Sequence, residues 1–120
     1  MKKKIFCFDL DNVICKTNLN NYKLSKPIKP VINLINKLYA KNYTIIIFTA
    51  RYMGRSKEKV TIAKRKAYNL TKSQLKKWNC NYHKIIFGKP SYDYLVDDKA
   101  YGFKKKWYDD FFRRFKIDLL

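Results

Sequence analysis

The sequence is 120 residues long, is 47% hydrophobic and 17% aromatic, and carries a net charge of +19 at neutral pH. This length fits one domain, and this apolar content excludes a disordered basic tail, so we expect a single domain over residues 1–120. No apolar run is long enough to span a membrane, and Asp9 and Asp11 interrupt the N-terminal run that could otherwise resemble a signal peptide.

Lysine supplies most of the positive charge and is scattered along the chain, with short runs only at 2–4 and 104–106. A basic surface attracts nucleic acid, phosphorylated metabolites or anionic lipid. Scattered lysines favour a solvated surface over a dedicated polyanion-binding face, so a nucleic-acid partner stays open but is not favoured. Three cysteines without metal-ligand spacing are typical of reduced thiols and predict a cytoplasmic protein with no membrane partner.

The first half of the chain predicts two strands around one helix. Residues 4–10, KIFCFDL, are short, apolar and aromatic, which predicts a buried strand. The polar, Asn-rich residues 14–28 predict a small flap. Pro30 suits a first helical position, and apolar residues then recur at helical spacing through Leu38. Residues 44–50, TIIIFTA, form a β-branched run that is apolar on both faces, as the centre of a parallel sheet requires.

Two helices are predicted next along the chain. Residues 56–68 are basic and predict one helix. Thr71 and Gln74 resemble a capping box that opens a second short helix through Trp78.

The last third predicts two strands, at 84–88 and 92–98, and a C-terminal helix over 102–116. This order predicts an α/β fold with a mainly parallel sheet. Only about six residues separate Phe87 from Tyr94, whereas a parallel crossover needs about a dozen or more. The final helix has more aromatic residues than one buried stripe needs, so we expect them mainly in the core, with a surplus that indicates an oligomer contact. These residues are Trp107, Tyr108, Phe111, Phe112 and Phe115.

Polar side chains follow each predicted strand, where a parallel sheet binds its ligands. They are Asp9 and Asp11, then Thr49 and Arg51, then Lys89, and finally Asp97 and Asp98. Four converging carboxylates would raise one another's pKa unless a cation neutralised them. Because the set offers only oxygen ligands, it predicts a hard cation, most readily Mg²⁺.

The same groups suit phosphoryl transfer. The hydroxyl of Thr49 and the charge of Lys89 would stabilise a phosphoryl group as its charge spreads over the oxygens. A carboxylate in line with phosphorus can form an aspartyl-phosphate. A second carboxylate two residues on can protonate the leaving oxygen and later activate water.

Four short segments, FDLDNV, FTAR, GKP and YLVDD, occur in this order between residues 5 and 98. Together they resemble the motifs of the haloacid dehalogenase (HAD) superfamily of phosphohydrolases. The resemblance implies a Rossmann-like three-layer sandwich with a mainly parallel central sheet. It also implies Mg²⁺ as the cofactor and a small phosphorylated substrate.

Carried over residue by residue, the resemblance implies that Asp9 is the nucleophile and Asp11 the general acid/base. It implies that Thr49 binds the phosphoryl group and that Lys89 orients the nucleophile and the phosphate. Mg²⁺ would be bound by Asp9, Asp11, Asp97 and Asp98. Arg51 and Asn12 would bind the substrate. Asn12 stands where relatives often have Gly. The chain has no room for a substantial cap, and capless relatives act on large substrates or use a neighbouring subunit as a lid.

The sequence therefore predicts a Mg²⁺-dependent phosphatase for a phosphorylated sugar or similar metabolite. It resembles a capless group linked to bacterial capsule and surface-polysaccharide synthesis. A nucleotide or polynucleotide 3′-end phosphatase is the enzymatic alternative. A basic nucleic-acid-binding protein on an inactive HAD fold is the alternative without catalysis. The single histidine, His83, has no partner cluster and is interpreted as structural.

Overall fold

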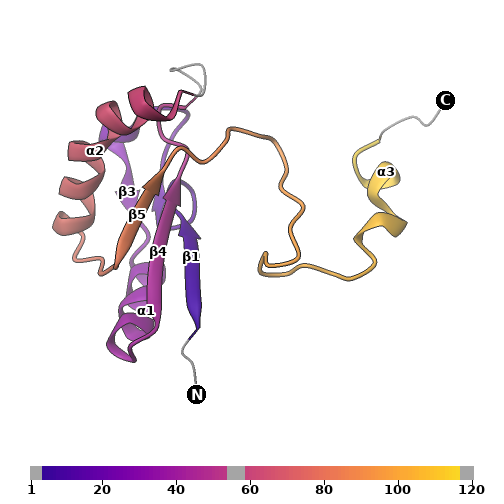
Figure 1. The fold of residues 1–120 in the computed structure, drawn as a ribbon, viewed down its shortest axis with the longest axis horizontal. Helices are drawn as coiled ribbons and strands as arrows, with labels where there is room; N and C mark the ends of the chain where they lie inside the picture. The colour runs from indigo at the N-terminus through magenta and orange to yellow at the C-terminus, as the bar shows by residue number, and fades with distance from the viewer. Residues whose placement is uncertain (1–3, 54–58, 117–120) are drawn as a thin grey trace.

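The structure is a computed structural model that describes residues 4–53 and 59–116 (Figure 1). Its main sheet is parallel, in the order β1-β4-β5, and a small antiparallel sheet pairs β2 with β3. The strands are β1 Ile5–Asp9, β2 Cys15–Lys16, β3 Lys26–Pro27, β4 Thr44–Thr49 and β5 Lys84–Phe87. The helices are α1 Lys29–Ala40, α2 Val60–Lys77 and α3 Phe111–Arg114, with 3-10 turns η1 Tyr22–Leu24 and η2 Trp107–Asp109.

The predicted central strand is confirmed. β4 pairs with β1 on one side and β5 on the other, and Ile45, Ile47 and Thr49 are buried along it. Asp9 lies opposite Phe48 in the register, so the carboxyl ends of the strands meet at one edge. This confirms the predicted α/β class with a parallel sheet.

Both long helices pack on the same face of the sheet. Successive right-handed crossovers in one direction, β1-α1-β4 and β4-α2-β5, place their helices on the same side. The core on this face takes Ile32 and Ile35 from α1, Leu75 from α2, and Ile45 and Ile47 from β4.

The opposite face of the sheet stays partly exposed. It carries the alternate residues of each strand, and Ile5 has 60% of its surface exposed. The other apolar residues on it are Cys7, Ile46, Phe48 and Ile86. β1 is therefore only partly buried, by Phe6 and Phe8 on the core side, although its sequence predicted a buried strand.

Residues 14–28, predicted as a flap, contain β2, η1 and β3. The flap is anchored on the core by Ile14, Cys15 and Tyr22, which are all buried.

The predicted division of residues 56–78 into two helices is wrong. α2 runs unbroken from Val60 to Lys77, and the predicted start at Ser56 lies outside the described residues. Thr71 and Gln74 are not a capping box, because they lie inside this helix and are buried against Arg51.

The C-terminal predictions are also wrong in part. Residues 92–98 form no strand, and within the predicted helix at 102–116 only η2 and α3 are helical. We call residues 91–116 the arm. Figure 1 shows the chain leaving the end of β5 and running away from the sheet to α3. The radius of gyration is 16.2 Å, against about 14 Å for a compact chain of this length.

No helix in the described part of the chain combines the length and apolar character needed to cross a bilayer.

The turn after β1 explains the residue at position 12. Asn12 has φ +65°, a left-handed conformation that glycine adopts freely and asparagine tolerates better than most residues. Its N–H donates to the Cys15 carbonyl at 2.6 Å, and its Oδ1 accepts from Thr17 N–H at 3.2 Å. Asparagine therefore adopts here a conformation that suits glycine, and its side chain binds the flap.

Replacing Asn12 tests this turn. Asn12→Ala should destabilise the protein by about 1 kcal/mol, because alanine tolerates this conformation poorly and loses the bond to Thr17. Asn12→Gly should cost less, since glycine keeps the conformation. Urea unfolding measures both, and Asn18→Ala in the exposed part of the flap is the control. Equal losses for the glycine and alanine variants would contradict this account.

Candidate active site

Asp9 and Lys89 form an ion pair at the carboxyl edge of the sheet. Asp9 ends β1, and Lys89 follows β5 by two residues. The Lys89 N–H donates to the Thr49 carbonyl at 3.1 Å, which places this residue over the end of β4. Its Nζ then lies 3.2 Å from Asp9 Oδ2. The structure thus brings together two of the predicted catalytic residues.

The charge of Lys89 is stabilised in this position. Burial by itself would lower the pKa of Lys89, but a hydrogen bond with Tyr92 and the negative charge of Asp9 outweigh it and raise the pKa. Lys89 is therefore a cation throughout the neutral range. Asp9 accepts the Leu10 N–H on Oδ1 at 2.8 Å, and 36% of its side chain is exposed, so a ligand can reach the carboxylate.

Asp11 is held by a buried arginine. Arg51 Nε lies 3.2 Å from Asp11 Oδ1 and 3.0 Å from Oδ2, and Nη2 lies 3.0 Å from Oδ1. The Thr17 hydroxyl donates to Oδ1 at 2.5 Å. Asp11 keeps 20% of its side chain exposed, whereas the side chain of Arg51 has none. This geometry fixes the position of the Asp11 carboxylate.

The rest of the Arg51 guanidinium binds α2 and the flap. Nη1 donates to Thr71 Oγ1 at 3.2 Å and to Gln74 Oε1 at 2.5 Å, and Nη2 donates to Ser25 Oγ at 3.3 Å. The guanidinium carbon lies 5.1 Å from the centre of the Tyr22 ring. Arg51 was predicted to bind substrate, but a side chain enclosed in this way positions Asp11 instead. No sequence signal indicated this contact, because Thr71 and Gln74 have the local pattern of a capping box.

Thr49 lies at the same edge and is fully buried. Its Oγ1 accepts the Arg51 N–H at 3.1 Å, and this bond does not use its own hydroxyl proton. Asn12, also predicted to bind substrate, turns its side chain toward the flap.

The structure does not bring Asp97 and Asp98 to this edge. Both are exposed in the arm, where Asp97 Oδ1 accepts the Lys99 N–H at 2.9 Å. The expected convergence of four carboxylates is therefore not found within one chain, because the short connection after β5 leads into the arm. Among the described residues, no three His, Cys, Asp or Glu side chains are close enough together to hold a metal ion. Metal binding by Asp97 and Asp98 stays a prediction.

The interpretation of His83 as structural agrees with its contacts. Its Nδ1 accepts the Ile45 N–H at 3.0 Å, and its ring stacks on Tyr39 with centroids 4.5 Å apart.

The sequence matches no protein-family profile and no curated protein. Solved structures do match. A crystal structure of a Vibrio cholerae protein aligns over 81% of this chain and 81% of its own, at 26% identity and a TM-score of 0.75. D,D-heptose 1,7-bisphosphate phosphatase from B. bronchiseptica, complexed with magnesium and phosphate, aligns over 97% of this chain and 65% of its own, at 16% identity and a TM-score of 0.50. The chain has the HAD fold.

A chain of the Pnkp1/Rnl/Hen1 RNA repair complex also matches this HAD-fold protein. It aligns over 78% of this chain and 27% of its own, at 17% identity and a TM-score of 0.53. The likeness is one of fold.

Replacing Arg51 should lower the stability of the protein and remove the contacts that hold the Asp11 carboxylate in place. Arg51→Met leaves the partly buried Asp11 carboxylate without its cation, so we expect a loss of about 3 kcal/mol in the free energy of unfolding. Arg51→Lys should recover part of it, because lysine restores the charge but not the two-pronged contact. Urea unfolding provides the measurement, with Arg65→Met on the exposed side of α2 as the control. If Arg51→Met and Arg65→Met were equally stable, the Asp11 contact would be unimportant.

Proposed function

We propose that the protein is a Mg²⁺-dependent phosphomonoester hydrolase that works through an aspartyl-phosphate on Asp9. The observation that carries the proposal is the ion pair between Asp9 and Lys89 at the carboxyl edge of a HAD-fold sheet. An exposed carboxylate with an adjacent fixed cation is suited to receive a phosphoryl group.

The reaction has two steps. An oxygen of Asp9 attacks phosphorus, and the bond from phosphorus to the ester oxygen breaks while Asp11 gives its proton to the leaving alcohol. Asp11 then takes a proton from water, which attacks the aspartyl-phosphate and releases inorganic phosphate and free Asp9. Lys89 and the Thr49 hydroxyl stabilise the charge on the phosphoryl oxygens in both steps.

Asp11 is positioned for proton transfer by Arg51. Of its two oxygens, Oδ1 receives contacts from the guanidinium and Thr17, whereas Oδ2 receives the single bond from Nε. Oδ2 therefore keeps a lone pair for the proton that Asp11 must exchange with the leaving group and water.

The candidate donors are of the chemical type that Mg²⁺ prefers. The carboxylate of Asp9 and the main-chain carbonyl of Asp11 are hard oxygen ligands, and Asp97 and Asp98 would supply the remaining carboxylates. Mg²⁺ neutralises charge on the phosphoryl oxygens when bound. The similarity to a phosphatase that holds magnesium and phosphate supports this assignment.

A phosphorylated sugar or similar small metabolite is the proposed substrate, in a cytoplasmic protein. The resemblance to the capsule and surface-polysaccharide group and the fold shared with a heptose bisphosphate phosphatase support it. The flap over residues 14–28 is too small to enclose a substrate, which supports a neighbouring subunit as the lid.

Hydrolysis of a polynucleotide 3′-phosphate is the second candidate. The net charge of +19 and the fold shared with a chain of an RNA repair complex favour it. A polyanion would bind such a surface in a salt-dependent way.

Asp9→Asn tests the mechanism. The wild type should release phosphate from an aryl phosphate only with Mg²⁺, and Asp9→Asn should lose at least about 10³-fold in kcat because its amide is no nucleophile. Circular dichroism should show that the variant is folded, and Asp109→Asn in the arm is the control. Comparable turnover by Asp9→Asn and wild type would exclude an aspartyl-phosphate at this residue.

A panel of substrates separates the two candidates. If the substrate is a sugar phosphate, kcat/KM for the best sugar phosphate should exceed kcat/KM for a 3′-phosphorylated oligonucleotide. It should also change little when the salt concentration is raised from about 50 to about 200 mM, a range in which nucleic-acid binding weakens strongly. A preference for the oligonucleotide that falls steeply with salt would replace the sugar assignment by the second candidate.

A further inference from the structure

The sheet has one edge and one face that are ready to receive another segment. β1 lies at the edge of the described sheet, with Ile5 60% exposed and Cys7 also exposed. The neighbouring residues of the same face, Ile46, Phe48 and Ile86, are partly exposed. An unpaired edge strand is a template for another strand, and parallel sheets normally have both faces covered.

The arm has the matching surface. Residues 91–102 are all exposed, including Tyr94 at 66%, Leu95 at 55% and Val96 at 48%. Within it, residues 92–98 are rich in strand-forming residues and end in the acid pair. Residues 91–98 contain three Asp and no Lys or Arg, in a chain of net charge +19. This acidic segment thus has the composition of a β-strand but pairs with no strand of the described sheet.

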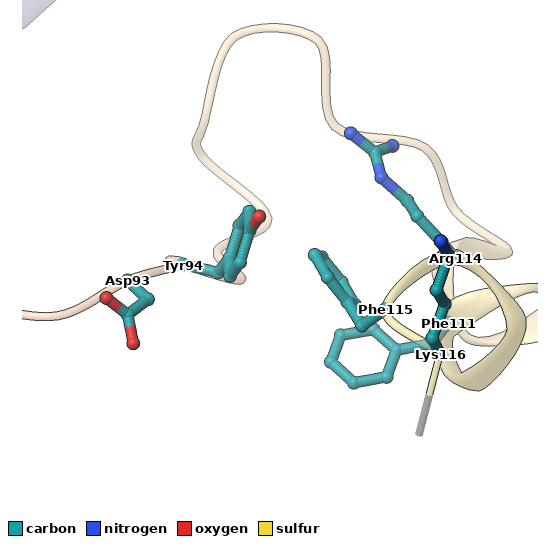
Figure 2. Close-up of a pocket in the computed structure, with 6 residues that line it drawn as sticks. All are labelled: Asp93, Tyr94, Phe111, Arg114, Phe115 and Lys116. Atoms are coloured by element: carbon teal, nitrogen blue, oxygen red, sulfur yellow. The ribbon is translucent and has the colours of Figure 1, made fainter. Parts of the chain in front are cut away.

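The aromatic residues of the arm pack on one another. Tyr94 and Phe115 lie with ring centroids 4.2 Å apart, and Phe111 and Phe115 with centroids 4.9 Å apart. Figure 2 shows Tyr94 directed toward Phe115, and both rings line an open pocket with Phe111 and Arg114. The arm therefore has an open aromatic surface of the kind that would cover an apolar sheet face.

Of the two edges of the sheet, only the β1 edge would bring the acid pair, Asp97 and Asp98, close to Asp9. A strand paired with β1 lies about 4.8 Å from it, whereas a strand added to the far side of β5 lies about 14 Å from β1. Asp97 comes close to Asp9 only in the first arrangement. In the parallel register that sets Asp97 level with Asp9, Leu95 is level with Cys7 and Asp93 with Ile5.

The connection is too short for this register within one chain. Lys89 is fixed over the end of β4 by its bond to Thr49. In that register Asp93 is level with Ile5 and Thr44, so it would have to lie two strands across and five residues down from Thr49, about 19 Å away. The four steps from Lys89 to Asp93 span at most about 14 Å when fully extended. In its own subunit, only about the last two or three residues of the segment can reach the edge.

We propose that the arm is exchanged between two copies of this chain. Residues 92–98 of each copy pair in parallel with the β1 edge of the other, and the aromatic part of the arm covers the exposed sheet face. Each acid pair, Asp97 and Asp98, then joins Asp9 and Asp11 of the partner, so that neither site is complete in a single chain. The exchange itself stands on the sheet edge and the connection, and only this last step rests on the proposed phosphatase function.

A disulfide bond tests the exchange without any assay of activity. In the proposed register Leu95 faces Cys7, so Leu95→Cys should form a bond with Cys7 on mild oxidation. The bond should join two chains and give a band of about twice the 14.5 kDa mass on a non-reducing gel. Val96→Cys is the control, because its side chain points to the opposite face and should give no such band. An oxidised Leu95→Cys chain that stays at the mass of one chain overturns the proposal.

Molar mass and mixing complete the test. Light scattering should give the mass of two chains for the wild type, and a monomer would overturn the exchange. Asp9→Asn and the double variant Asp97→Asn/Asp98→Asn should each be inactive alone. Refolded together in equal amounts, they should recover about a quarter of wild-type activity, since half of the dimers are mixed and one of their two sites is intact.

The outcomes separate the two proposals. A dimer with the Leu95→Cys bond but no phosphatase activity in the wild type supports the exchange and rejects the proposed function. Phosphatase activity in a monomer supports the function and rejects the exchange. An active wild-type dimer whose variants show no recovery on mixing rejects the shared site.

Discussion

The buried Arg51 guanidinium sets the geometry of the whole site. A planar cation with no exposed surface must have its N–H groups bonded, because unpaired buried charge costs several kcal/mol. Its partners come from the turn after β1, from the flap and from α2, so bonding this one group fixes three segments that are far apart in sequence. The position of Asp11 follows from this requirement.

Much of the fold could be predicted because its strands are strongly patterned. The β-branched run at 44–50 became the central strand, and the acids after β1 and the lysine after β5 met at one edge as the parallel order required. The buried state of Arg51 could not be read from its type, since an arginine after a strand is more often exposed. Thr71 and Gln74 have the local pattern of a cap, but their bonds to Arg51 place them in the interior of α2.

The C-terminal part of the sequence was harder to predict, because its strand-like composition conflicts with the short segment that connects it to β5. Residues 92–98 have the composition of a strand, yet the chain between Phe87 and Tyr94 is too short for a regular parallel crossover. The same short connection leaves out the helix that would cover the second face of the sheet. The exposed face with Ile5 and the extended arm are thus two results of one missing segment.

The ion pairs of the site also bear on how the fold would respond to loss of the proposed Mg²⁺. Acid clusters commonly need a cation to fold, because like charges repel at close range. In this chain Asp9 already faces Lys89 and Asp11 already faces Arg51, so each carboxylate of the core carries its own counter-ion. These two carboxylates are balanced without a metal, so under the proposed function chelation should stop phosphate release while leaving the fold of the core intact.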